Sequence, residues 1–262
     1  MNYLIAGNWK MNGSRASAIS LASGLVSRAN AAGDPLPGIV LCPPGPLLPT
    51  VISAISGSVI AAGGQDCHAK DKGAHTGDTS AALLADIGCR YVIVGHSERR
   101  ADHGETDAQV RAKAEAALNA GLIPIICVGE TEAERERGET DAVVTRQIKG
   151  SIPERATSAT IVVAYESVWA IGTGKTPTTA DIAAVHGLIR KVYGGGRPPS
   201  FESPALTAGG KADVRVLYGG SVKGSNAVEI LATAGVSGAL VGGASLDLED
   251  FWRIIQACPA KS

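Results

Sequence analysis

Residues 105–128 read ETDAQVRAKAEAALNAGLIPIICV, and this stretch decides the fold class. Its first part has apolar residues at helical spacing, namely Val110, Ala114, Ala117 and Leu118. Gly121 follows them, and glycine is the residue that most readily ends a helix in the left-handed conformation. Residues 123–128 are then almost continuously apolar, which is typical of a strand buried on both faces of a parallel sheet. A helix followed by such a strand predicts an α/β protein.

The same alternation of helix and strand patterns runs along the whole chain. Short β-branched runs predict strands at residues 3–8, 38–42, 59–64, 91–95, 123–128, 160–165, 215–218 and 238–241. No linker divides them, so we expect one domain over residues 1–262, and eight such units is the number that closes a (β/α)₈ barrel. An open doubly wound sheet is the alternative, but its phosphate-binding fingerprint after the first strand is absent here.

One stretch, residues 194–213, breaks this rhythm. It is rich in Gly and Pro and has no periodicity. It connects a helix to the next strand, and such connections lie on the N-terminal face of a barrel, away from the catalytic face. We therefore interpret it as a surface insertion that takes no part in the site.

Composition and charge exclude several classes of protein. Aromatic residues make up 4% of the 262 residues and the net charge is −1, which argues against a nucleic-acid platform. The longest apolar runs are too short to span a membrane, and the N-terminus does not resemble a signal peptide. The five cysteines are odd in number and form no C-x-x-C pair, which favours reduced thiols in a cytoplasmic protein. Cys67 and His68 have no third ligand nearby in the sequence, so we expect no metal site.

Polar residues follow the ends of three predicted strands. Asn8 and Lys10 come at the end of the first, His96 after the fourth and Glu166 after the sixth. Alone, each has a commoner structural role, as a solvated charge or a hydrogen-bonded histidine. In a barrel, however, these positions meet at one mouth. A base, an electrophile and a fixed cation are what proton abstraction beside a carbonyl requires.

Glycine-containing loops supply a second part of the expected site. They cover residues 170–175, 218–221 and 241–245, and the latter two follow the last two strands, where barrels often bind phosphate with backbone N–H groups. Ordinary tight turns are the alternative for either loop alone. Two nucleotide motifs fail, because Trp169 and Pro177 stand where a P-loop and a dinucleotide fingerprint each require Gly. We therefore expect no ATP or NAD site.

Taken together, these motifs resemble the triosephosphate isomerase family over nearly the whole chain. The resemblance rests on the stretches at residues 7–12, 94–100, 124–130, 164–166, 168–175, 218–222 and 240–246. It implies a TIM barrel that interconverts dihydroxyacetone phosphate and D-glyceraldehyde 3-phosphate through an enediolate, in glycolysis and gluconeogenesis, without a cofactor. The fold, the roles and the lid of this family are general knowledge of it.

The resemblance also implies a role for each candidate residue. Glu166 would move the proton between the two carbons, and His96, kept neutral at a helix N-terminus, would polarise the carbonyl. Lys10, supported by Asn8 and ion-paired to Glu98, would offset the negative charge.

A phosphate site and a lid follow from the same resemblance. The phosphate would be bound by backbone groups of Gly172, Ser221, Gly242 and Gly243. The lid that closes over it would comprise Val168, Trp169, Ala170, Ile171, Gly172 and Thr173.

Members of this family are typically homodimers. The loop at residues 68–78, with Thr76 at its tip, would reach Asn12 and Glu98 of the partner subunit near its Lys10. His75 stands where many relatives carry an aromatic residue.

Ser167 is the sharpest departure from the family pattern, which has Pro after the catalytic Glu. Serine restores a backbone N–H and conformational freedom that proline removes. We hypothesise that the lid is less tightly coupled to Glu166 here, which would lower turnover without abolishing it.

Two other functions stay open at this stage. An isomerase of the same fold could act on a four-carbon ketose phosphate, because one methylene changes binding by only ~1–3 kcal/mol. A non-catalytic barrel that serves as a scaffold is the second alternative, and the presence of Asn8, Lys10, His96 and Glu166 argues against it.

Overall fold

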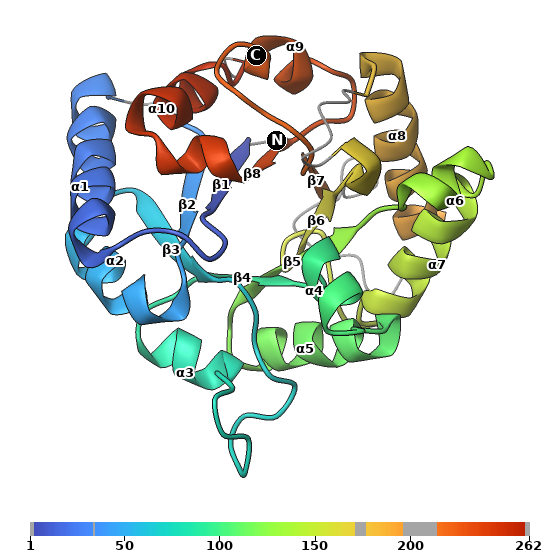
Figure 1. The fold of residues 1–262 in the computed structure, drawn as a ribbon, viewed down its shortest axis with the longest axis horizontal. Helices are drawn as coiled ribbons and strands as arrows, with labels where there is room; N and C mark the ends of the chain where they lie inside the picture. The colour runs from blue at the N-terminus through green and yellow to red at the C-terminus, as the bar shows by residue number, and fades with distance from the viewer. Residues whose placement is uncertain (1–2, 34, 171–176, 196–213, 260–262) are drawn as a thin grey trace, which may run out of the picture.

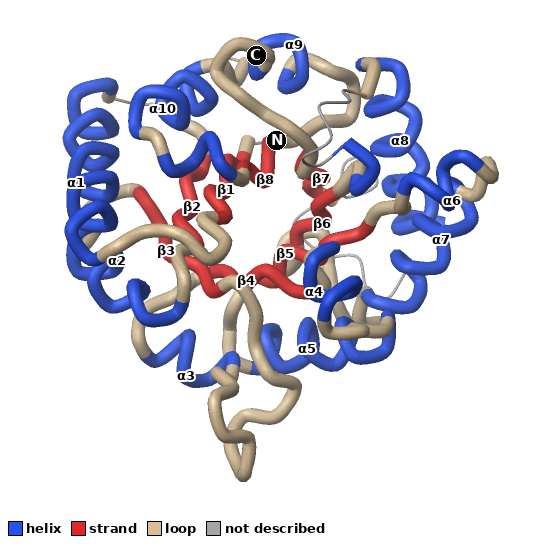
Figure 2. Tube along the Cα trace, viewed as in Figure 1, coloured by secondary structure: helices blue, strands red, loops and turns tan. Residues whose placement is uncertain are grey.

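The computed structural model describes residues 3–33, 35–170, 177–195 and 214–259. Its centre is a closed barrel of parallel strands in the order β1 to β8, so that β1 pairs with both β2 and β8. Leu4 is the register partner of Gly38 on one side and of Gly238 on the other. Figures 1 and 2 show the strands as an inner ring surrounded by helices. The predicted single-domain (β/α)₈ barrel is confirmed.

Every predicted strand is present, with ends that differ by two residues or fewer. The bounds are β1 Leu4–Asn8, β2 Gly38–Cys42, β3 Ile60–Gly64, β4 Tyr91–Val94, β5 Ile123–Val128, β6 Val162–Tyr165, β7 Arg215–Tyr218 and β8 Gly238–Val241.

Helices cover the outside of the barrel. Among the described residues they are α1 Arg15–Ala32, α2 Leu48–Ala54, α3 Ala81–Asp86, α4 Ser97–Asp102, α5 Asp107–Asn119, α6 Glu132–Glu136, α7 Thr140–Ser151, α8 Thr179–Gly195, α9 Ala227–Leu231 and α10 Leu248–Gln256. Short 3₁₀ turns are η1 Gly45–Leu47, η2 Val168–Ala170 and η5 Gly243–Leu246. α5 begins at Asp107 after a capping box, in which the Thr106 and Gln109 side chains bind each other's backbone N–H groups.

The strands are mostly apolar because both of their faces are buried. In β5, Ile125 and Cys127 point into the barrel interior, whereas Ile126 and Val128 pack in the layer between sheet and helices. This alternation is the period of two that a β-strand imposes on its side chains. The two-layer core leaves the polar residues to the ends of the strands.

The ends of the predicted insertion are visible. α8 ends at Gly195 and β7 begins at Arg215, so the stretch does connect a helix to a strand, but residues 196–213 lie outside the described residues. In the part of the chain that the structure describes, no helix has the length and apolar character needed to cross a membrane.

Candidate active site

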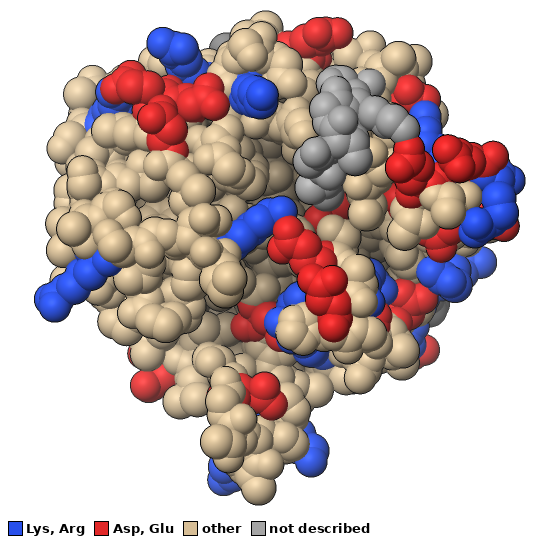
Figure 3. Space-filling model, in the orientation of Figure 1, with Lys and Arg blue, Asp and Glu red and all other residues tan. Residues whose placement is uncertain are grey.

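The predicted site residues lie together at the C-terminal ends of the strands. Asn8 is the last residue of β1, His96 lies just beyond β4, and Glu166 directly follows β6. Asn8, Lys10 and His96 line a pocket of about 550 Å³ with the glycine-rich loops after β7 and β8. Figure 3 shows this face hollowed at its centre, with basic and acidic side chains meeting beside the hollow.

The main chain of Glu166 is fixed by contacts with both neighbouring strands. Its N–H donates to the carbonyl of Val128 at 2.8 Å, and Gly219 N–H donates to the carbonyl of Tyr165 at 2.7 Å. A Cβ on Gly129 would lie only 1.8 Å from the carbonyl oxygen of Glu166. Any larger residue at position 129 would therefore displace the main chain of Glu166.

The carboxylate of Glu166 is buried and accepts hydrogen bonds from the start of α4. Ser97 donates from its N–H to Oε2 at 2.9 Å and from its hydroxyl to Oε1 at 3.0 Å. Nε2 of His96 lies 2.9 Å from the same Oε1. Ser97 was not among the predicted site residues, although its place directly after His96 was a signal that could have identified it.

His96 and Glu166 shift each other's pKa. Burial raises the pKa of Glu166, but the charge of His96 and the hydrogen bonds from His96 and Ser97 lower it, and the net direction is downward. Burial lowers the pKa of His96, yet the Glu166 carboxylate opposes this and the net direction is upward. The sequence resemblance implies that His96 stays neutral. Contact with the Glu166 carboxylate acts in the opposite direction, because it raises the pKa of His96.

The other ring nitrogen of His96 determines its neutral tautomer. Nδ1 accepts a hydrogen bond from the N–H of Glu98 at 3.2 Å, at the N-terminus of α4. Nδ1 is therefore unprotonated in the neutral ring, and Nε2 carries the hydrogen. His96 thus presents an N–H donor toward Glu166 and the pocket.

Lys10 is held by an unusual backbone conformation. Its φ is +52°, the one positive φ of a non-glycine residue among those described. Its N–H donates to Oδ1 of Asn8 at 3.1 Å, and its carbonyl accepts from Nε2 of Gln65 at 2.8 Å. Its Nζ lies 2.5 Å from Oε1 of Glu98, the expected ion pair. Strained positions of this kind concentrate at functional sites.

The loops after β7 and β8 form the other wall of the pocket. Ser221, Gly242 and Gly243 line it, and a Cβ on Gly242 would come nearest to Lys10, at 3.7 Å from Cε. η5 begins at Gly243, where the hydroxyl of Ser245 donates to the carbonyl of Gly242 at 2.7 Å. Of the predicted lid residues, Ile171, Gly172 and Thr173 lie outside the described residues.

The described part of the predicted lid, Val168–Ala170, forms η2 and is attached to a buried carboxylate. Glu130 accepts hydrogen bonds from Nε1 of Trp169 at 3.0 Å and from the hydroxyl of Tyr165 at 3.1 Å. Arg135 lies over the Trp169 ring at 4.2 Å, a cation–π contact. Glu130 lies in the stretch 124–130 that carries the family resemblance, but its sequence context predicts no role for it.

The loop between β3 and α3 extends away from the barrel, as Figures 1 and 2 show. Its predicted tip, Thr76, is exposed. Asn12 is exposed too, and the neighbouring Met11 has a relative exposure of 94%. His68 is not isolated as its sequence context indicated, because the ring of His75 stacks on it at 4.0 Å and Asp78 lies near both. Nδ1 of His68 accepts from the N–H of Lys70 at 3.0 Å, and its Nε2 lies 3.7 Å from Oδ2 of Asp78.

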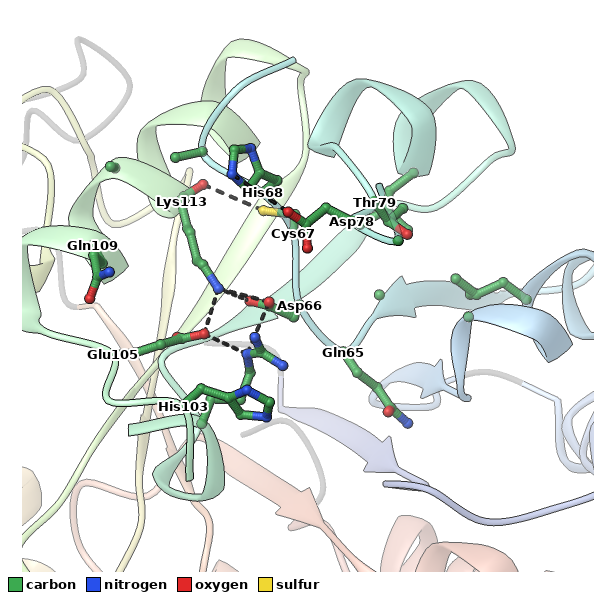
Figure 4. Close-up of a pocket in the computed structure, with 18 residues that line it drawn as sticks. Gln65, Asp66, Cys67, His68, Asp78, Thr79, His103, Glu105, Gln109 and Lys113 are labelled. Carbon is green, nitrogen blue, oxygen red and sulfur yellow. Dashed lines mark hydrogen bonds and ion pairs between the residues drawn. The ribbon is translucent and has the colours of Figure 1, made fainter. Parts of the chain in front are cut away.

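A second cavity of about 510 Å³ lies at the base of this loop. Figure 4 shows its charged wall, in which Lys113 points toward Asp66 and Glu105. Lys113 Nζ lies 2.7 Å from Asp66 Oδ2 and 2.6 Å from Glu105 Oε1, and Arg99 approaches both carboxylates. Mutually paired charges of this kind connect the loop to the barrel and do not compose a catalytic set.

Comparison with known proteins agrees with this geometry. The family model described as triosephosphate isomerase matches residues 3–258. Triosephosphate isomerase of Afipia carboxidovorans is 54% identical over 98% of this chain and 97% of that protein, and that of Ruegeria pomeroyi is 53% identical over 97% and 96%. The crystal structure of triosephosphate isomerase from Bartonella henselae superposes with a TM-score of 0.86 at 42% identity, covering 98% of this chain and 99% of that one. The chain belongs to the triosephosphate isomerase family.

Proposed function

We propose that the chain interconverts dihydroxyacetone phosphate and D-glyceraldehyde 3-phosphate, the reaction of its family, and that Glu166, His96 and Lys10 carry it. The observation that supports this most is the convergence of the three side chains. Glu166 and His96 touch at 2.9 Å, and Lys10 and His96 line the same pocket. An isomerisation of this kind needs no external oxidant or reductant.

The reaction requires a carbon-bound proton to change places. The Glu166 carboxylate removes a proton from C1 of dihydroxyacetone phosphate, and the electron pair forms the C1–C2 double bond of an enediolate. The N–H of His96 Nε2 stabilises the oxygen at C2 and transfers protons between the two oxygens. Glu166 then returns its proton to C2, which yields the aldehyde. Since both carboxylate oxygens accept hydrogen bonds from Ser97, one of them exchanges that bond for the substrate.

Lys10 and the glycine loops hold the charged parts of the substrate. Lys10 offsets the negative charge of the enediolate and the phosphate, and Asn8 and Glu98 fix its position. Backbone N–H groups of Ser221, Gly242 and Gly243, together with Gly172, bind the phosphate. The lid, Val168 to Thr173, covers the site and excludes water, which strengthens each charge interaction inside.

We further infer a cytoplasmic homodimer. The protruding loop with Thr76 would reach Asn12 and Glu98 of a second copy, and the exposed Met11 is an apolar contact available at the same place. The five cysteines are free, in agreement with a reducing compartment. Size-exclusion chromatography with light scattering tests the assembly, since a monomeric mass would contradict it.

A coupled steady-state assay on three- and four-carbon sugar phosphates tests the activity. We expect turnover of both triose phosphates, with a lower kcat/KM for a four-carbon ketose phosphate. Glu166→Gln should remove most of the turnover while inorganic phosphate still binds. A four-carbon preference would favour the first alternative, and a chain that turns over neither substrate would favour the scaffold.

A further inference from the structure

Ser167 is fully buried at the C-terminal end of β6 and has a specific partner. Its Oγ lies 3.2 Å from the hydroxyl of Tyr218, the last residue of β7, and the contact is itself buried. β6 and β7 are neighbours in the barrel, with Tyr165 and Tyr218 in register. The hydrogen bond therefore joins the ends of two adjacent strands one residue after Glu166.

Gly220 shows how closely the chain packs around this pair of hydroxyl groups. A Cβ at position 220 would lie 2.1 Å from Tyr218 Oη and 2.7 Å from Ser167 Oγ. No larger residue fits there without displacing the pair. Because a buried hydroxyl without a partner is costly, each of these groups keeps the other in place.

The main chain on both sides of the Ser167 side chain is also fixed. The preceding peptide is held by the bond from Glu166 N–H to Val128, and the carbonyl of Ser167 accepts from Ala170 N–H at 2.8 Å, within the first turn of η2. Proline would fix φ of residue 167, whereas serine leaves the main chain free to rotate about it. The bond from Oγ to Tyr218 restricts that rotation.

We propose that Ser167 is a positioning residue, whose hydrogen bond to Tyr218 fixes the main chain beside Glu166 as a proline ring would. This rests on the proposed function, since it concerns the placement of the same base. It revises the expectation that serine loosens this segment. The hydrogen bond between Ser167 and Tyr218 and the ring of a proline then restrict the same main-chain rotation by different means. Alanine at position 167 provides neither.

Four variants test the proposal: Ser167→Ala, Ser167→Pro, Tyr218→Phe and the double variant Ser167→Pro/Tyr218→Phe. We expect Ser167→Ala and Tyr218→Phe each to lower kcat on the order of tenfold with little change in KM, because a small displacement of the base slows proton removal. Ser167→Pro should stay within a few-fold of the unmodified chain. The loss of kcat caused by Tyr218→Phe should be smaller in the Ser167→Pro background than in the unmodified chain.

A second measurement separates positioning from mere loss of folded protein. With dihydroxyacetone phosphate deuterated at C1, the isotope effect on kcat should rise in Ser167→Ala, whereas partial unfolding would leave it unchanged. Thermal unfolding of each variant is measured as well, to show that the variant is folded under the assay conditions. If Ser167→Ala does not fold, the two Tyr218→Phe variants still decide the question.

Specific results would overturn the proposal. Unchanged kcat in Ser167→Ala would show that the hydrogen bond does not position the base. An equal loss from Tyr218→Phe in both backgrounds would show that Tyr218 acts without Ser167. Inactivity of the unmodified chain would refute the proposed function, whereas an active chain with unaffected variants would refute the role of Ser167 alone.

Discussion

Nε2 of His96 lies 2.9 Å from Oε1 of Glu166, and both side chains are buried. The neutral ring has its hydrogen on Nε2, because Nδ1 accepts from the N–H of Glu98. The contact is therefore a hydrogen bond from the proposed electrophile to the proposed base. The two side chains that we propose to act on different atoms of the substrate are bound to each other in this structure.

This pairing predicts that Glu166→Gln lowers the pKa of His96. Burial lowers that pKa already, and removing the carboxylate removes the main influence that raises it. The measurement is an NMR titration of the ring in both proteins. An unchanged pKa would mean that Glu166 is not what controls protonation of His96.

Lys10 offers a second prediction. Lys10→Met keeps most of the side-chain volume and removes the cation that faces Glu98 and the pocket. We expect kcat/KM to fall on the order of 10²–10³-fold, as for the loss of one charge-stabilising group at a reacting oxygen. Circular dichroism should show an intact fold. A variant with full activity would remove Lys10 from the proposed mechanism.

Gly129 and Gly187 form a matched pair of substitutions. Gly129→Ala places a Cβ 1.8 Å from the carbonyl of Glu166, so we expect a loss of activity and a destabilisation of about 1–3 kcal/mol. Gly187 is exposed within α8 and has open space around it. Gly187→Ala should raise stability by about 1 kcal/mol and leave activity unchanged. Denaturant unfolding and the coupled assay measure both. Equal effects of the two changes would contradict this account of Gly129.

His186 predicts how stability depends on pH. It is buried in α8, Nδ1 lies 3.1 Å from the carbonyl of Gly235, and burial lowers its pKa to about 4, with Arg190 adding to the shift. In the unfolded chain the His186 ring has a pKa near its ordinary value of 6.5. Above that pH the ring is neutral in both states, so its protonation does not destabilise the folded chain. Stability should fall as the pH decreases from 6.5 to 4, by about 3 kcal/mol in total.

The control for this prediction is His186→Asn, which keeps a donor for Gly235 but does not titrate. The difference in unfolding free energy between the two proteins should narrow as the pH falls through this range. A constant difference would assign the acid sensitivity to other groups.

The sequence predicted the barrel well because the strands are buried on both faces, and a buried strand such as β5 is apolar at each position. It also predicted the positions of Asn8, Lys10, His96 and Glu166, since chain order and strand ends alone bring them to one mouth. It did not predict the contacts of Ser97 with Glu166 or of Glu130 with Trp169. Those depend on side-chain direction, which neither periodicity nor spacing encodes. The stacking of His75 on His68 depends in the same way on how a long loop folds back.

The pairing of Leu4 with Gly238 has a consequence for synthesis of the chain. β1 leaves the ribosome first, yet one of its two neighbours is the last strand made. Until β8 arrives, β1 and β7 each expose an unpaired apolar edge of the kind that joins edges of other molecules. The barrel therefore closes only after β8 has been made, and a chain that stops before residue 238 keeps two open strand edges.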